Sequence, residues 1–292
     1  MNEPRIIVYT PESLLSNPAK LSREMVRDLV ASRELAWRLT VRDLSAQYRQ
    51  TFLGFLWAII MPLANTLVWV FLSRSGVVNV SDTLLPYPVY VFTGTMLWAT
   101  LMDALNAPLQ IVTASKIMLA KINFPREALV VAGIYQTIFN ALIKVTLLLI
   151  ALLVMGIHPD WSVLLFPIGL LSLILVGTLI GLALTPVGLL YADVGKAIPL
   201  LMQSLMYLTP VVFAMPKESL PATLFQLNPL TPLILTARDW LTGFTPEHLD
   251  YFVVVNVVSI VLLFMFWVVF RLAMPILIER VGSLHGRDAD QS

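Results

Sequence analysis

Six long stretches almost free of charged side chains constrain this chain more than any other feature. They are residues 50–73, 83–115, 128–157, 161–192, 197–216 and 251–270. Asp103 interrupts the second stretch and Lys144 the third, and the other four contain no Asp, Glu, Lys or Arg. About 20 apolar residues in a helix suffice to cross the roughly 30 Å hydrocarbon core of a bilayer. The sequence therefore predicts an all-α, polytopic membrane protein with six transmembrane helices.

The composition excludes several other classes of protein. Charged residues make up 13% of the chain, well below the share in soluble domains, whereas hydrophobic residues make up 58%. So little polar surface excludes an ordinary soluble enzyme, a disordered chain and a nucleic-acid binder. The absence of cysteine excludes disulfides, thiolate metal sites and a Cys nucleophile, and the three scattered histidines form no metal-binding motif.

Basic residues are distributed unevenly between alternate loops. Arg74, Lys217 and Arg238 are the only Lys or Arg residues in the loops on one side of the six spans, and all others outside the spans fall on the opposite side. Cytoplasmic loops of membrane proteins carry an excess of Lys and Arg. We therefore expect both termini to be cytoplasmic.

The charged segment 1–49 predicts a cytoplasmic helix that precedes the first span. Asn17-Pro18 is a typical helix start, and residues 20–49 contain neither Gly nor Pro. At helical spacing the segment has an apolar stripe of Trp37, Val41, Leu44 and Tyr48 and a separate basic stripe of Arg38, Arg42 and Arg49. Such a helix lies along the inner membrane surface, with its aromatic rings in the interface and its arginines at lipid phosphates. The alternative is that the apolar stripe packs on the protein's own cytoplasmic loops.

Asp103 and Lys144 are ionisable side chains inside the spans, which makes them functional candidates. Counted from the cytoplasmic ends of their spans, their depths differ by roughly 12 Å, which is too far for a direct pair. We expect Lys144 to extend towards the membrane surface, and Asp103 to face a polar interior or the inner interface.

The chain contains no nucleotide-binding motif. Its Gly195-Lys196 pair lacks the upstream glycine of a P-loop and is followed by Ala197. The spans also lack a series of Asp, Glu and His residues of the kind that carries protons. If the chain transports a substrate, the energy should enter from a partner, and no cofactor is expected in this chain.

Three segments carry a resemblance to a known family. They are 48–63 at the entry to the first span, Asn123 to Glu127 in the first cytoplasmic loop, and Asn228 to Pro232 with Arg238 and Gly243. They resemble the ABC-2 type permeases that export bacterial cell-surface polysaccharides, namely O-antigen, capsule and teichoic acid. The resemblance implies a homodimer in the bacterial inner membrane, bound to two copies of a separate ATPase subunit that holds ATP and Mg. It also implies a lipid-linked glycan as the substrate.

In that family the loop 113–127 forms a coupling helix that fits into a cleft of the ATPase. The residues that the resemblance assigns to coupling here are Lys121, Phe124, Pro125, Arg126 and Glu127. An aromatic anchor surrounded by Lys and Arg is a reasonable composition for such an interface. The alternative is a basic loop that touches only lipid headgroups.

Spans 1 and 5 line the conduit between protomers in that family. The candidate lining residues are Trp57, Asn65, Trp69, Gln203 and Tyr207. On span 5, Gln203 and Tyr207 share one helical face, and Met202, Met206 and Phe213 share the adjoining one. Aromatic rings and amides could hold sugars by many weak contacts, although such stripes more often serve packing.

The resulting organisation has a cytoplasmic segment 1–49, a membrane domain 50–273 and a cytoplasmic tail 274–292. Within the membrane domain, the Pro-rich segment 215–245 predicts outer re-entrant helices, and Gly177-x-x-x-Gly181 predicts close helix packing inside the protomer. We expect a transport subunit rather than an enzyme. The alternatives are an ABC-2 exporter of drugs or small lipids and, in a different class, a membrane-embedded glycosyltransferase or acyltransferase.

Overall fold

The computed structural model describes most of the chain, including every long apolar stretch at least in part. The described residues are 18–49, 53–76, 83, 85–115, 118–119, 125–157, 160–215 and 220–289. Each regular element within these ranges is helical, which confirms the all-α prediction for the described part of the chain.

The helices follow one another in an order that matches the apolar pattern of the sequence. They are α2 (Pro18–Ala31), α3 (Arg33–Arg49), η1 (Gly54–Leu56), α4 (Trp57–Arg74), α5 (Tyr87–Ala114), α7 (Glu127–Val154), η2 (Trp161–Leu165), α8 (Phe166–Leu190), α9 (Ala192–Tyr207), α10 (Leu220–Leu227), α11 (Leu230–Thr242) and α12 (Leu249–Ala289).

Within the described ranges, four helical segments are long and apolar enough to cross a membrane. They are Trp57–Arg74, Glu127–Val154, Trp161–Leu190 and Leu249–Leu277. Helix α5 has 28 residues and sufficient length, but its side chains are less apolar. Helix α9 has only 16 residues, or roughly 24 Å, which is shorter than the hydrocarbon core. The structure therefore supports a membrane protein with four clear spans, and the six-span plan stays a prediction.

Helices α5 and α8 form the centre of the bundle and pack with their backbones close together. A Cβ atom added to Gly177 would lie 2.6 Å from the Cβ of Ala104 and 2.6 Å from the carbonyl oxygen of Leu101. A Cβ atom added to Gly181 would lie 2.2 Å from the carbonyl oxygen of Leu105. The small-residue pattern thus serves packing within the chain, as the sequence predicts.

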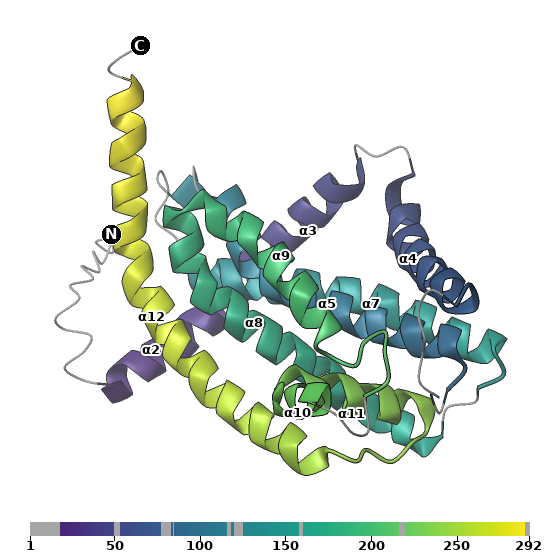
Figure 1. Cartoon of the computed structure of the whole chain (residues 1–292). Helices are drawn as coiled ribbons and strands as arrows, with labels where there is room; N and C mark the ends of the chain where they lie inside the picture. The colour runs from purple at the N-terminus through teal and green to yellow at the C-terminus, as the bar shows by residue number, and fades with distance from the viewer. Residues whose placement is uncertain are drawn as a thin grey trace.

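Helices α4 and α12 lie at opposite edges of the bundle in Figure 1. Thr66 is the buried residue of α4, so nearly the whole helix is open to its surroundings. Helix α12 runs along the other edge and continues to Ala289, far beyond the apolar stretch. The predicted tail from 274 onwards is therefore helical as far as Ala289.

The N-terminal segment forms two helices, where the sequence predicts one. Helix α2 begins at Pro18 as expected, but Ser32 separates it from α3. The hydroxyl of Ser32 donates a hydrogen bond of 2.6 Å to the carbonyl oxygen of Asp28, four residues earlier. Back-bonding of this kind bends helices, which accounts for the interruption without Gly or Pro.

The prediction that Asp103 and Lys144 are too far apart to pair is wrong. The ammonium group of Lys144 on α7 forms an ion pair with the carboxylate of Asp103 on α5. The depth estimate treated both helices as parallel rods, whereas packed helices cross at an angle. The four-carbon stem of Lys144 covers the remaining separation. Each charge is thus compensated inside the bundle.

The expected fifth span also differs, because α9 begins five residues earlier than residue 197 and ends at Tyr207. Pro210 cannot donate a backbone hydrogen bond and disfavours helical geometry at Thr209, so the helix stops before it. Two short helices, α10 and α11, follow and lie together in the lower part of Figure 1. We refer to this region as the α11 end of the bundle, and to the region around α2 and the start of α7 as the α2 end.

Candidate functional site

Of the loop 113–127 assigned to ATPase coupling, the structure describes residues 113–115, 118–119 and 125–127. Lys121 and Phe124 lie outside the described residues, whereas Pro125 is exposed and Arg126 is half-buried. Glu127 is the first residue of α7 and is only 6% exposed. A carboxylate so deeply buried in the chain does not face a partner, so any part that Glu127 has in coupling is indirect.

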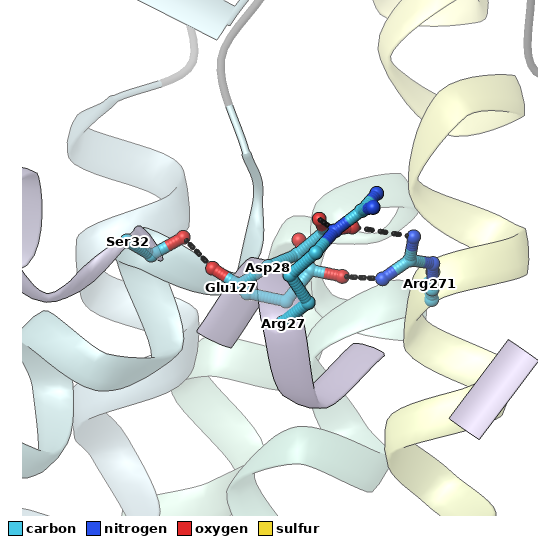
Figure 2. Close-up of polar contacts among 5 residues, drawn as sticks. All are labelled: Arg27, Asp28, Ser32, Glu127 and Arg271. Carbon is cyan, nitrogen blue, oxygen red and sulfur yellow. Dashed lines mark hydrogen bonds and ion pairs between the residues drawn. The ribbon is translucent and has the colours of Figure 1, made fainter. Parts of the chain in front are cut away.

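Glu127 belongs to a cluster of ionic contacts that joins three helices at the α2 end, as Figure 2 shows. The guanidinium group of Arg271 on α12 donates through Nη1 to Oε1 of Glu127 at 2.6 Å and through Nη2 to Oδ2 of Asp28 at 2.7 Å. The Nε atom of Arg27 lies 3.9 Å from Oδ1 of Asp28. We call Asp28, Glu127 and Arg271 the ionic junction.

The ionic junction makes the three helices mechanically dependent on one another. The side chains of Arg271, Asp28 and Glu127 are 10%, 18% and 7% exposed, so their charges are largely removed from water. Removing one partner of a buried ion pair typically costs about 3–5 kcal/mol, because the other charge stays buried and unpaired. If the loop before Glu127 were displaced, these ion pairs should therefore also displace α2 and α12.

Two of the four residues of the apolar stripe predicted on the N-terminal helix are exposed in the structure. Trp37 and Val41 are 60% and 45% exposed, whereas α3 buries a different face that contains Ala36 and Leu39. Thr40 of that face donates to the carbonyl oxygen of Ala132 on α7 at 3.2 Å. The ring of Trp37 also lies 6.2 Å from the ring of Tyr135 on α7, so the apolar stripe is partly covered by the chain itself.

The basic stripe of α3 is only partly described. Arg38 pairs with Glu34 at 2.6 Å and Arg42 pairs with Asp43 at 2.7 Å, both on the exposed face. Tyr48 and Arg49 lie in α3, but their side chains are outside the described residues. The headgroup-binding role of these four residues stays a prediction.

Three of the five predicted conduit residues come together between α4 and α9. The ring of Trp69 lies 6.2 Å from that of Tyr207 and 5.5 Å from that of Phe213, both edge to face. The amide of Gln203 donates to the hydroxyl of Tyr207 at 3.2 Å. Trp57, which is 44% exposed, is the first residue of α4, and Asn65 is exposed near the middle of that helix.

The two faces of α9 have different environments. Met202 and Met206 are buried in the core, so the methionine face serves packing. Gln203, Ser204 and Tyr207 lie on the exposed side. Gln203 donates to Tyr207, and Ser204 donates to the carbonyl oxygen of Leu200, so these polar groups are satisfied within the helix. The exposed side of α9 also contains the apolar residues Leu200 and Leu201.

The Asn-Pro pair at 228–229 and the glycine at 243 mark the start and the end of α11. The Oδ1 atom of Asn228 accepts a hydrogen bond of 3.0 Å from the backbone nitrogen of Leu230, and Pro229 directly precedes the helix. Gly243 ends the helix with φ at 88°, a left-handed conformation that favours glycine. These residues therefore define a helix whose Arg238 side chain is almost completely buried.

The sequence reasoning missed Asp28, Arg271 and the buried position of Arg238. Arg271 ends the last apolar stretch, which is a typical place for a basic residue at a membrane surface and gave no sign of a buried pair. The available signal was that Arg238 follows an uncharged, mostly apolar run from Leu230 to Ala237. No group of His, Asp or Glu residues with the arrangement of a metal site occurs in the described ranges.

Comparisons with known proteins identify the class of this membrane protein. A model of the family described as ABC-2 type transporter matches residues 34–239, and the chain belongs to this family. It is therefore a transport protein and not an enzyme, which rules out the transferase alternative.

Two relatives are similar to this chain over most of its length. An O-antigen export system permease protein RfbA from Myxococcus xanthus is 26% identical over 213 residues, covering 72% of this chain and 81% of the relative. A protein with the same name from Klebsiella pneumoniae is 23% identical over 209 residues, covering 69% of this chain and 77% of the relative.

Proposed function

We propose that this chain is the permease subunit of an ATP-driven exporter that moves a lipid-linked polysaccharide, of the O-antigen type, across the bacterial inner membrane. The names of its relatives support the substrate class. The structural observation that carries the proposal is the surface between α4 and α9, where the exposed side chains of Gln203 and Tyr207 lie beside the partly buried ring of Trp69. A sliding glycan needs many weak contacts of this kind and no deep charged site.

The conduit requires a second copy of the chain. Helix α4 has almost no buried side chains, and its exposed residues include Asn65 and Trp57 as well as apolar groups. Two copies facing one another through α4 and α9 would shelter the polar groups and leave a path between them. The charged pair Asp103 and Lys144 lies between α5 and α7 and is neutralised, so it does not trap the substrate.

ATP hydrolysis by two copies of a separate ATPase subunit would act through the loop 113–127. Phe124 and the basic residues Lys121 and Arg126 would contact the ATPase, with Pro125 shaping the end of the loop. Glu127 would then transmit movement of the loop to α2 and α12 through the ionic junction.

In the bilayer, the chain would have both of its termini on the cytoplasmic side. The Lys and Arg distribution supports cytoplasmic termini, α3 along the inner surface, and the α11 end on the outer side. Helices α5 and α9 would complete six crossings, and α10 and α11 would be re-entrant. We rank an exporter of drugs or small lipids second, since no relative described above carries such a name.

The test is deletion of the gene for this chain, followed by gel analysis of surface polysaccharide and extraction of lipid-linked glycan from the inner membrane. We expect loss of long surface chains and accumulation of the lipid-linked precursor at the inner membrane. Expression of the chain should restore export only together with an active ATPase subunit. Normal surface polysaccharide in the deletion strain would contradict the proposal.

A further inference from the structure

Arg238 lies in an unusual position for a cation in an apolar bundle. It is only 2% exposed, and it is among the largest fully buried side chains of the described residues. Its Nη1 atom donates to the carbonyl oxygen of Pro210 at 2.9 Å, and its Nη2 atom donates to the carbonyl oxygen of Val211 at 2.9 Å. Its guanidinium carbon lies 3.8 Å from the centre of the Tyr90 ring, a cation–π distance.

Two further side chains bind the same stretch of backbone. The hydroxyl of Tyr90 on α5 lies 3.1 Å from the carbonyl oxygen of Pro210 and 3.0 Å from that of Phe213. The amide of Asn228 donates to the carbonyl oxygen of Leu208 at 2.9 Å and to the hydroxyl of Thr209 at 2.8 Å. We call Tyr90, Asn228 and Arg238 the carbonyl clasp.

The carbonyl clasp solves a problem that the end of α9 creates. The last carbonyl groups of a helix have no partner within the helix, and non-helical backbone at membrane depth is tolerated only where protein or a cavity supplies one. Here the side chains of α5, α11 and the turn before α11 supply the hydrogen bonds. A cation also interacts favourably with the negative end of the helix dipole.

The clasp depends on a close approach to α5 that only glycine permits. A Cβ atom added to Gly94 would lie 2.1 Å from the carbonyl oxygen of Val211 and 2.3 Å from Nη2 of Arg238. Both atoms belong to one of the clasp hydrogen bonds. Any larger residue at position 94 must therefore push the turn or the guanidinium group out of place.

Stability alone does not explain the choice of arginine. The Nε atom of Arg238 is buried without a hydrogen-bond partner among the described residues, which costs free energy. In the same part of the chain no carboxylate lies within 4.0 Å of its nitrogens in an ion pair. What arginine offers is a rigid fork that binds two adjacent carbonyl groups at once.

The turn held in this way carries part of the conduit surface. Tyr207 is the last residue of α9, Phe213 lies beyond Val211, and both pack against Trp69 of α4. We propose that Arg238 is a positioning residue that fixes the α9 turn at residues 208–213, so that Tyr207 and Phe213 hold Trp69 and the conduit wall stays closed around its substrate. The role in the conduit rests on the proposed function, whereas the position of the turn can be measured without it.

The natural chain has no cysteine, so the turn can be probed by a single introduced thiol. Val212 is fully buried within the turn, and Val212→Cys should react slowly with a membrane-impermeant maleimide in membranes that contain the full chain and its ATPase. Adding Arg238→Lys, which removes the two-pronged contact, should raise the labelling rate about tenfold, because one buried charged hydrogen bond changes an opening equilibrium by about that factor. Tyr90→Phe and Gly94→Ala should act in the same direction from α5.

The matched control is Thr236→Val on the same helix. Thr236 is fully buried, and its hydroxyl has no hydrogen-bond partner among the described residues, so this nearly isosteric change should leave labelling unchanged. The proposal would be overturned if the Arg238, Tyr90 and Gly94 variants are labelled at rates within twofold of that of Val212→Cys alone. Equal increases in the control and in these variants would overturn it as well.

A second readout separates positioning from a general structural defect. Arg238→Lys should lower glycan-stimulated ATP hydrolysis more than basal hydrolysis, because the loosened wall no longer senses the substrate. Equal loss of both activities would count against a role in positioning. If the proposed function is wrong, glycan will not stimulate ATP hydrolysis in the unmodified complex. The labelling experiment still tests the carbonyl clasp in that case.

Discussion

Three cations among the described residues of this bundle bind different kinds of partner. Lys144 pairs with a carboxylate of the neighbouring helix, Arg271 binds two carboxylates from two helices, and Arg238 binds carbonyl oxygens. A simple pair joins two helices at one point. The fork of Arg271 instead joins α2 and α7 to α12 through one side chain.

The ionic junction predicts a graded loss of stability. Arg271→Met removes both ion pairs of the junction, leaves Asp28 only its 3.9 Å contact with Arg27, and should destabilise the protein by about 3–5 kcal/mol. Glu127→Gln leaves Arg271 with Asp28 and should cost less. The Glu127→Gln variant should keep its basal ATP hydrolysis but lose glycan export, because the loop is no longer bonded to Arg271 of α12. Thermal unfolding of the solubilised complex and a glycan export assay measure the two effects.

Arg38→Met is the matched control for the ionic junction. Its ion pair with Glu34 is exposed, with both side chains 74% accessible, and pairs of this kind contribute little to stability. If Arg38→Met and Arg271→Met lower the unfolding temperature equally, the junction has no special role.

At the scale of elements, α8 and α5 approach closely because α8 presents glycines along the contact. Gly177→Ala should destabilise the protein by about 1–3 kcal/mol, the usual cost of overpacking, since its Cβ would lie 2.6 Å from the backbone oxygen of Leu101. Gly195→Ala is the control, because the nearest atom to its Cβ lies 3.9 Å away and alanine favours a helix. Equal unfolding temperatures for the two variants would contradict this account of the packing.

The positions of the helices could largely be predicted from the sequence, because charge-free runs leave few other ways to satisfy a backbone in lipid. The end of α9 was harder to place, since it depends on Pro210 together with partners from α5 and α11. The pair of Asp103 and Lys144 joins residues 41 positions apart through the crossing of two helices, which a count along the chain does not contain. The ionic junction spans even longer separations and has no local pattern.

For the whole molecule, the candidate conduit surface and the candidate coupling loop lie on different elements, and the bundle must connect them. Two sets of contacts could connect them: the ionic junction at the start of α7 and the carbonyl clasp at the end of α9. Between them, the tight α5 and α8 contact forms a stiff centre. Movement of the loop would therefore reach the conduit by tilting whole helices and not by local rearrangement.

The central claim is that α4 and α9 face a water-filled path while α12 faces lipid. Single variants Trp57→Cys, Asn65→Cys, Gln203→Cys and Tyr207→Cys can be compared with Ile260→Cys and Phe264→Cys in the otherwise cysteine-free chain. The two α12 positions are 57% and 46% exposed, so burial does not protect them.

The decisive measurement is labelling of these six variants by a water-soluble thiol reagent during active export. We expect the four α4 and α9 positions to react and the two α12 positions to stay unreactive, because hydrocarbon excludes both the reagent and the thiolate. Equal labelling of both groups, or no labelling of α4 and α9 in a complex that exports glycan, would contradict the account.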